Sequence, residues 1–156
     1  MTSRRDFTDE EWTRVRRAPL VAGVAISLAD PGGPIEMAKE TMATLRSATL
    51  PPSQEELLAA VALDIQALAQ DVQDPLGYFK PRGGQQVLEE LRGVNELVTA
   101  KATSQEAEAF REWLLAAAQA AADAGKEGGF LGFGGEQVSA GEQRMLEQVR
   151  AVLRMA

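Results

Sequence analysis

Four short segments of the sequence have the pattern of a helix N-terminus. In each, a hydroxyl residue is followed three positions later by glutamate: Thr8–Glu11, Ser53–Glu56, Thr103–Glu106 and Ser139–Glu142. In such a capping box the hydroxyl accepts a hydrogen bond from one unpaired amide, and the glutamate side chain reaches back to another. Apolar residues at helical spacing follow each box, and no segment makes a convincing strand. The sequence therefore predicts an all-α fold.

Six helices are expected, and the short connections between them favour one compact bundle. Their approximate ranges are Asp9 to Asp30, Pro34 to Ser47, Gln54 to Val72, Gln85 to Ala100, Ser104 to Ala124 and Ala140 to Met155. The whole chain, 1–156, is expected to form a single domain with a flexible N-terminus over 1–7. Because Pro19 removes a hydrogen bond inside the first range, we expect either a kink or two helices that meet near Arg17.

The apolar residues predict which side of each helix faces the core. The segment after Pro19 is apolar on all sides and is expected to form a buried central helix. The predicted inward stripes of the other five helices are Ile35, Ala38, Met42 and Leu45; Leu57, Val61, Ile65, Leu68 and Val72; Val87, Leu91, Val94 and Val98; Phe110, Trp113, Leu114 and Ala117; and Leu146, Val149 and Leu153.

The sequence contains neither cysteine nor histidine. The first absence excludes disulfides, thiolate nucleophiles and zinc–sulfur sites, and the second removes the commonest acid–base group and metal ligand. The net charge of −7 opposes binding to nucleic acid or to an anionic membrane. The longest apolar run, Leu20 to Ala29, is too short to cross a bilayer. We therefore expect a cytoplasmic protein and predict no cofactor, although a hard divalent cation remains open.

Three aspartates are candidate ligands or acid–base groups. Asp64 and Asp71 are seven residues apart, so both lie beside the apolar stripe of the third helix. A carboxylate at such a boundary can transfer a proton or bind a hard cation, or it can simply pair with a basic residue or reach solvent. Asp30 lies at a helix end before a Pro–Gly turn and is a further candidate metal ligand, or only part of a helix stop.

The segment before the fourth helix contains the ingredients of an anion site. Lys80 and Arg82 supply positive charge, and Gly83 and Gly84 precede a helix N-terminus, where backbone amides attract anions. The spacing is not that of a phosphate-binding P-loop. The alternative interpretation is a turn whose glycines permit an unusual backbone and whose aromatic residues cover the core.

A glycine-rich loop, 128–135, carries three bulky apolar residues: Phe130, Leu131 and Phe133. No strand precedes it, so it does not match a dinucleotide-binding fingerprint. It is expected to lie on the core, and its functional alternatives are an interaction surface or a lid over a pocket.

Several of these segments resemble a family of uncharacterised small all-helical bacterial proteins. The resemblance rests on Phe7-Thr8-x-Glu10-Glu11-Trp12, Ala18-Pro19, Ala29-Asp30-Pro31-x-Gly33 and 129–135, and it implies a helical fold without an activity. The chain is also similar to tellurite-resistance TerB-like domains at Leu28-Ala29-Asp30-x-Gly32 and Val138-Ser139-x-x-Glu142. That similarity implies a small helical bundle with metal-binding acidic clusters. Pro31 and Pro34 depart from its acidic loop, so no metal ligand is carried over.

Together these patterns favour a non-catalytic protein that acts through helix-mediated association, with a protein partner or with itself. Two alternatives remain open. One is a hard-cation-binding module or a carboxylate-dependent enzyme that uses Asp64, Asp71 and Asp30. The other is a carrier of a small apolar ligand that uses the loop around Phe130.

Overall fold

The structure is a computed structural model that describes residues 2–29, 34–71, 76, 79–126 and 139–154, with side chains except at 34–35, 68–71 and 125–126. The described part of the chain is helical and contains no strand. The elements are a short 3-10 helix η1 (Arg4–Asp6) and the helices α1 (Asp9–Ala29), α2 (Pro34–Ala48), α3 (Glu56–Asp71), α4 (Gly84–Lys101), α5 (Ser104–Lys126) and α6 (Ala140–Arg154). The predicted all-α fold and its six helices are confirmed, with boundaries that differ by at most two residues.

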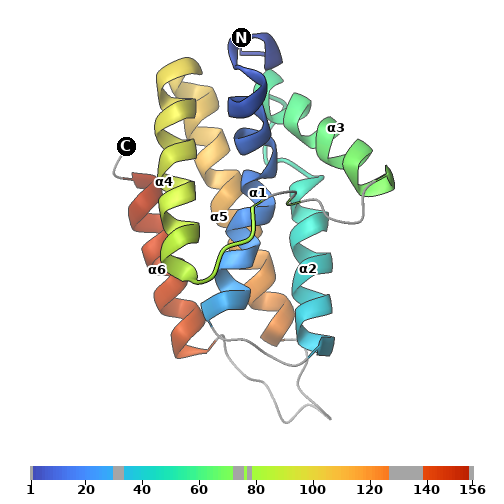
Figure 1. The fold of residues 1–156 in the computed structure, drawn as a ribbon, viewed down its shortest axis with the longest axis vertical. Coiled ribbons are helices and arrows are strands. Elements are labelled where there is room, and N and C mark those ends of the chain that lie inside the picture. Colours follow the sequence, from blue (N-terminus) through green and yellow to red (C-terminus); the bar gives the residue numbers. More distant parts are fainter. Residues whose placement is uncertain (1, 30–33, 72–75, 77–78, 127–138, 155–156) are drawn as a thin grey trace.

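Helices α1 and α5 form the centre of the bundle and contact most of the others. In Figure 1 both run down the molecule, with α4 and α6 beside them on the left and α2 and α3 on the right. α3 crosses the upper end of the bundle at an angle, whereas α2 runs along its length (Figure 1). α2 packs mainly against α5 and then against α1. One side of the molecule is therefore built from the consecutive helices α2 and α3.

The predicted central helix is confirmed, and it is continuous. α1 runs through Pro19 as one helix, so the chain does not form two helices that meet at Arg17. Leu20, Val21 and Ile26 are buried, as expected for a helix surrounded by others. None of the described helices combines the length and the hydropathy that crossing a bilayer requires.

Three of the predicted capping boxes contribute hydrogen bonds at helix starts. The Glu11 amide donates to Thr8 Oγ1 (3.1 Å) and the Thr8 amide to Glu11 Oε1 (2.8 Å). The same reciprocal pair joins Thr103 and Glu106, at 3.1 and 3.3 Å. At the start of α6 the Glu142 amide donates to Ser139 Oγ (3.2 Å). Local sequence therefore determines where α1, α5 and α6 begin.

The fourth predicted box, Ser53–Glu56, is wrong in detail. Helix α3 begins at Glu56, two residues later than expected, and Ser53 Oγ accepts a hydrogen bond from the Glu55 amide (3.4 Å). The amide of Leu57 instead donates to Glu106 Oε2 of α5 (3.3 Å). A distant carboxylate therefore caps this helix, which the local pattern cannot indicate.

The predicted inward stripes of α3 to α6 are buried wherever the structure describes them. The confirmed residues are Leu57, Val61, Ile65, Val87, Leu91, Val94, Val98, Phe110, Trp113, Leu114, Ala117, Leu146, Val149 and Leu153. The side chains of Ile35, Leu68 and Val72 lie outside the described residues.

The predicted inward stripe of α2 is wrong at Ala38 and Met42, whereas Leu45 is partly buried and packs against the core as expected. Ala38 is exposed and the Met42 side chain is 59% exposed, whereas Glu40, Thr44 and Ala48 are buried. The helix is therefore rotated so that small and polar residues face the bundle. An amphipathic helix usually buries its apolar side, so α2 departs from the common arrangement.

Specific contacts with α1 and α5 explain this rotation. A Cβ atom at Gly23 would overlap the Thr44 side chain, so α1 and α2 approach closely at this point. Ser27 Oγ of α1 donates to Glu40 Oε2 (2.5 Å), and Trp113 Nε1 of α5 donates to the Ser47 carbonyl (2.8 Å). These contacts require the small and polar side of α2 to face inward, and they direct Met42 outward.

The close approach at Gly23 gives a prediction about stability. Gly23→Ala is expected to destabilise the protein by about 1–3 kcal/mol, because the new methyl group would overlap Thr44 even at its Cβ, 2.8 Å away. Gly93→Ala in α4 is the matched control, because its methyl group would meet only the terminal guanidinium nitrogen of Arg14, which can move. This control should change stability by less than about 1 kcal/mol, because the helix propensity gained from alanine offsets a weakened contact between Arg14 and Glu90 at a partly exposed site. Urea denaturation followed by circular dichroism measures both, and equal midpoints would contradict the close packing of α1 and α2.

Candidate functional site

The predicted carboxylate Asp64 is engaged with a buried tryptophan. Its Oδ2 accepts a hydrogen bond from Trp12 Nε1 at 2.7 Å, and Trp12 is 1% exposed. The contact fixes α3 against α1, and it gives Asp64 a structural partner. Among the described residues no group of three or more acidic side chains is placed to bind a metal ion. Asp30 and the side chain of Asp71 lie outside the described residues, so the proposed pair with Asp64 stays a prediction.

The predicted anion-binding residues lie at the start of α4. Lys80 and Arg82 are exposed, Gly83 is the N-cap in an extended conformation, and Gly84 begins the helix. The Arg82 amide donates to Gln86 Oε1 at 2.7 Å. A Cβ at Gly84 would meet the methyl end of Met145, so the helix start approaches α6 closely. These contacts fit a turn that begins α4, and anion binding stays a prediction.

The glycine-rich loop, 128–135, is not among the described residues. Phe130, Leu131 and Phe133 lie outside the described residues. Its use as an interaction surface or as a lid stays a prediction.

The buried carboxylate of Glu106 joins three parts of the chain. Its Oε1 accepts hydrogen bonds from Thr2 Oγ1 (2.6 Å) and the Thr103 amide, and its Oε2 accepts from the amides of Thr2 (3.1 Å) and Leu57. Burial raises the pKa of Glu106, but the hydrogen bonds from Thr2 and Thr103 lower the pKa by more, to below its ordinary value of 4.5. The group is thus an ionised structural cap rather than a proton donor at neutral pH. The segment expected to be flexible over 1–7 is here packed at Thr2 and Phe7, both of which are buried.

A second charged cluster ties α1 to α4. Glu90 accepts a hydrogen bond from Arg14 Nε at 2.8 Å and lies 3.6 Å from a terminal nitrogen of Arg17. The Arg17 guanidinium also lies over the Phe79 ring, 4.9 Å from its centre, in a cation–π contact. Arg17 Nε is buried and has no hydrogen-bond partner among the described residues. The contacts of Arg14 and Arg17 with Glu90 nevertheless give the cluster the character of a structural link between α1 and α4.

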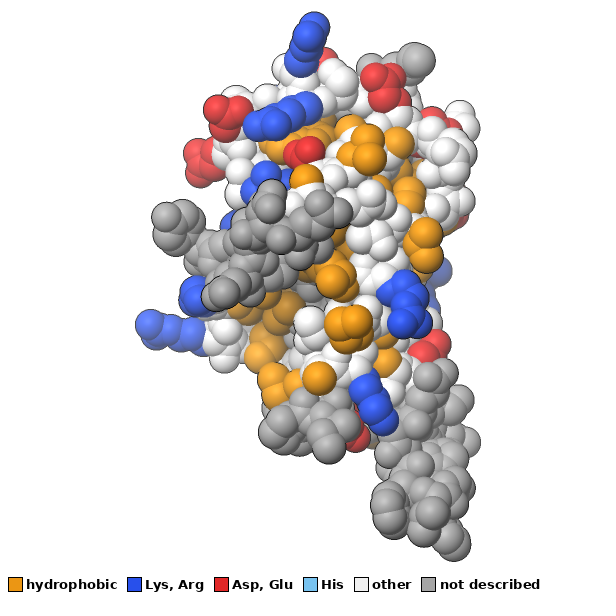
Figure 2. All heavy atoms as spheres, turned by 90° about the vertical axis from the view of Figure 1, so that its right-hand side faces the viewer, with side chains coloured by type: hydrophobic (Ala, Val, Ile, Leu, Met, Phe, Trp, Pro, Cys, Tyr) orange, Lys and Arg blue, Asp and Glu red, His pale blue; other side chains and the backbone are white. Residues whose placement is uncertain are grey.

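Exposed large apolar side chains of the described residues occur on α2, directly after it and on α3, the helices that form the right-hand side of the bundle in Figure 1. Among the described residues the large hydrophobic side chains that are most exposed are Met37 (48%), Met42 (59%), Leu50 (68%) and Leu63 (65%). Met37 and Met42 are in α2, Leu50 follows it, and Leu63 is in α3. We call Met42, Leu50 and Leu63 the α2–α3 surface. Met37 is five residues before Met42, about 140° around the helix, and lies on the side of Thr44 instead. Figure 2 shows this side of the bundle, where hydrophobic side chains form a band that runs along the molecule between charged groups.

A hydrogen bond links the end of α2 to α3. Gln66 of α3 donates from its side-chain amide to the Thr49 carbonyl at 3.5 Å, beside Leu50. Leu63 is three residues before Gln66 and therefore lies on the same side of α3. The segment that leads into Leu50 therefore approaches the side of α3 that carries Leu63.

Two cations flank the centre of the α2–α3 surface. An α-helix rotates by about 100° per residue, which places Lys39, Met42 and Arg46 on the same side of α2. Lys39 and Arg46 are both exposed, and neither forms an ion pair with a described residue. Glu36, in the first turn of α2, is also exposed. In a chain with a net charge of −7, this exposed stretch of α2 has an excess of positive charge.

Sequence reasoning missed this surface because it assigned the apolar residues of α2 to the core. Leu50 and Leu63 were not singled out, and Met42 was placed inward. One signal was present: Gly23 and Ser27 of α1 require a partner helix with a small or polar face, which α2 supplies with Thr44 and Glu40. Recognising that pairing needs the tertiary contacts.

Comparisons of the chain with protein-family models, with curated proteins and with solved structures find no match.

Proposed function

We propose that the protein acts by docking a partner helix on the α2–α3 surface. The partner segment is an amphipathic helix with an apolar stripe bordered by carboxylates, supplied by another protein. The observation that carries this proposal is the orientation of α2, which buries Glu40 and Thr44 and exposes Met42. Because an exposed apolar band bordered by polar residues is typical of interaction sites, this orientation supports association rather than catalysis.

The chemistry of the surface supports a helical partner. Met42 has a flexible, polarisable side chain that adapts to different partners, and an amphipathic helix presents residues at the spacing that matches α2. Each large side chain that becomes fully buried contributes about 1.5–3 kcal/mol. Part of that gain offsets the lost freedom of the two molecules. We therefore expect a dissociation constant of micromolar order.

The charges on α2 favour an acidic partner over a second copy of the chain. Lys39 and Arg46 lie on the same flank of Met42, so carboxylates at matching positions of a partner helix would meet both. Two copies that paired antiparallel through Met42 would instead bring Lys39 of one copy against Arg46 of the other. Like charges in contact destabilise such a pair.

The proposal predicts that Met42→Glu abolishes docking. The probes are two synthetic amphipathic helices with the same leucine stripe, one bordered by glutamates and the other by lysines. Fluorescence anisotropy should show that the protein binds the glutamate peptide at least tenfold more tightly than the lysine peptide. Met42→Glu should weaken binding of the glutamate peptide at least tenfold, because it places a carboxylate at the centre of the apolar contact. Ala151→Glu, at an exposed position of α6, is the matched control and should bind as the parent does.

Two results would overturn this proposal. The first is equal binding of the glutamate and lysine peptides, or equal binding by the parent and Met42→Glu. The second is a parent protein that is dimeric in size-exclusion chromatography with light scattering and becomes monomeric on Met42→Glu. In that case a second copy, rather than an acidic partner, occupies the surface.

A further inference from the structure

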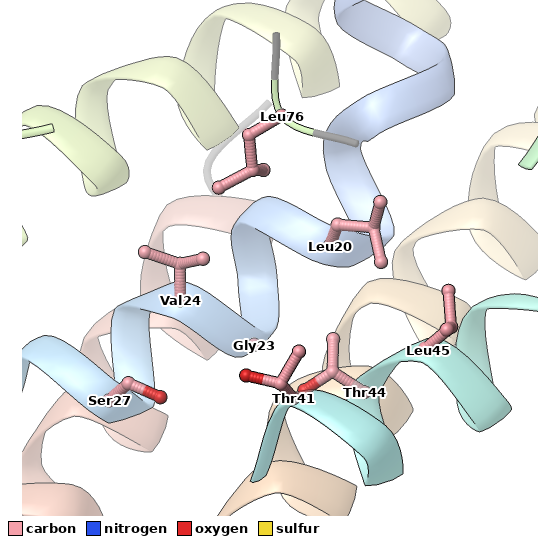
Figure 3. A pocket seen from close by; sticks show the side chains of 8 residues that line it. All are labelled: Leu20, Gly23, Val24, Ser27, Thr41, Thr44, Leu45 and Leu76. Atoms are coloured by element: carbon pink, nitrogen blue, oxygen red, sulfur yellow. The ribbon is translucent and has the colours of Figure 1, made fainter. Parts of the chain in front are cut away.

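A pocket of about 190 Å³ lies between α1 and α2. Leu20 and Val24 of α1 form one wall, Leu45 of α2 forms the other, and Leu76 reaches over from the segment between α3 and α4. Figure 3 shows these side chains around the hollow, with the ribbon of α1 passing Gly23 at its base. The lining is mostly apolar, and none of the described residues that form it is acidic or basic.

Three hydroxyl groups also line the pocket, and each donates its hydrogen bond within the protein. Ser27 Oγ donates to Glu40 Oε2 at 2.5 Å, Thr41 Oγ1 to the Met37 carbonyl at 2.8 Å, and Thr44 Oγ1 to the Glu40 carbonyl at 2.7 Å. A hydroxyl oxygen keeps acceptor capacity after it donates its hydrogen. The pocket therefore offers a ligand apolar contacts and hydrogen-bond acceptors, but no hydroxyl donor that is uncommitted.

We propose that this pocket binds a small uncharged molecule with a compact apolar body, with or without one hydroxyl group of its own. The size follows from the volume, because an apolar cavity of about 150 Å³ in another protein accommodates benzene. A molecule of the size of toluene or a six-carbon alcohol matches the pocket described here. The hydroxyl of an alcohol could donate to the oxygen of Ser27, Thr41 or Thr44.

The surroundings of the pocket disfavour an anionic ligand. None of the described lining residues is Lys or Arg, so none of them would neutralise a carboxylate inside the pocket. The buried side chain of Glu40, 3% exposed, accepts the hydrogen bond of Ser27, so that hydroxyl does not offer its hydrogen to an anion. Moving an unpaired anion out of water is costly. The pocket therefore discriminates between an alcohol and the carboxylate of the same chain length.

This inference does not rest on the proposed docking of a helix. The pocket lies on the side of α2 that faces α1, whereas Met42 points outward from the bundle. Ligand binding can therefore succeed or fail independently of peptide binding.

The test uses toluene, 1-hexanol and hexanoate as probes, with binding measured by ligand-observed NMR titration and by the shift in Tm. Toluene and 1-hexanol should bind in a saturable manner and raise Tm by mass action, and hexanoate should bind at least tenfold more weakly than 1-hexanol at pH 7. Val24→Phe from α1 and Thr41→Phe from α2 place a ring in the pocket and should each weaken binding at least tenfold. Thr41 is exposed, so its added bulk does not enter the core and this variant should remain folded.

Thr13→Phe is the matched control. Thr13 Oγ1 donates to the Asp9 carbonyl one turn earlier at 2.9 Å, as Thr41 does to Met37, but Thr13 does not line the pocket. This variant should bind toluene and 1-hexanol as the parent does. The inference is overturned if neither probe binds in a saturable manner, if both filling variants bind as the control does, or if hexanoate binds as tightly as 1-hexanol.

Discussion

Replacing Glu106 by glutamine is expected to lower the free energy of unfolding by about 2–4 kcal/mol at pH 7. The carboxylate accepts four hydrogen bonds, from Thr2 Oγ1 and from the amides of Thr2, Leu57 and Thr103. Glutamine keeps one acceptor oxygen and points an NH₂ group at donors that then lack a partner. Hydrogen bonds to charged groups are stronger than those between neutral groups. The expected loss of stability is therefore large, although glutamine has nearly the same volume as glutamate.

The effect of Glu106→Gln should depend on pH in one direction. The pKa of Glu106 lies below 4.5 in the folded protein, so the carboxylate contributes stability above the pKa of the unfolded chain. That contribution is lost as the pH falls through about 4.5 and then through the folded-state pKa. The difference between the parent and the variant should therefore shrink as the solution becomes more acidic.

Urea denaturation at a series of pH values measures this difference. Glu112→Gln, at an exposed position of the same helix, is the control and should change stability by less than about 0.5 kcal/mol at any pH. If Glu106→Gln is as mild as this control, or if its cost does not change with pH, the carboxylate does not cap the helices as the structure describes.

Replacing Trp113 by alanine is expected to destabilise the protein by about 3–5 kcal/mol. The side chain is fully buried, and its ring packs edge-on against Phe110 with the ring centres 6.0 Å apart. Its Nε1 donates a hydrogen bond to the Ser47 carbonyl in the last turn of α2. The indole therefore fills the centre of the bundle and also satisfies a helix-terminal carbonyl. Its removal leaves a cavity and takes away one of two hydrogen bonds to the Ser47 carbonyl, which also accepts from the Leu50 amide at 3.2 Å.

Trp113→Phe separates these two contributions. Phenylalanine keeps most of the apolar volume but cannot donate to Ser47, so its expected cost is smaller, about 1–3 kcal/mol. Thermal and urea unfolding of the parent and both variants give the comparison. Equal losses for alanine and phenylalanine would assign the whole effect to the hydrogen bond, and no loss for phenylalanine would remove the proposed role in fixing α2.

Much of the fold could be predicted because the local signals agree with one another. Thr8–Glu11 and Thr103–Glu106 form the capping boxes that their spacing indicates. The stripes that include Leu91 and Val149 are apolar on one side only, so periodicity alone identifies their buried face. Such features depend on residues that are close in sequence.

Features that depend on distant residues could not be predicted. Glu106 was expected to cap its own helix, but its contacts with Thr2 and Leu57 join positions that are 104 and 49 residues apart. Likewise the rotation of α2 is determined by contacts from Gly23 and Ser27 of α1, and by Trp113 of α5. The periodicity of apolar residues predicts the buried side of a helix, but it carries no information on the shape of the helices that pack against it.

The candidate site was missed for that same reason. A rule that turns apolar residues inward places Met42 in the core, whereas the exposed surface exists because α2 breaks the rule. Places where local reasoning fails are often those where a structure serves function. The predicted candidates Asp64, Lys80 and Arg82 came from residue type and spacing, which do not show whether polar groups converge.

The most direct test of the proposed docking is a charge-reversal experiment on α2. Lys39→Glu combined with Arg46→Glu leaves the apolar residues of the α2–α3 surface intact and changes only the charges beside Met42. Arg92→Glu combined with Arg144→Glu, at exposed positions of α4 and α6, changes the net charge by the same amount elsewhere and serves as the control. Anisotropy titrations with the glutamate and lysine peptides then compare the parent, the variant and the control. We predict that the parent and the control bind the glutamate peptide at least tenfold more tightly, and that the α2 variant reverses this preference. A variant that keeps the preference of the parent, or a control that reverses it, would contradict docking at α2.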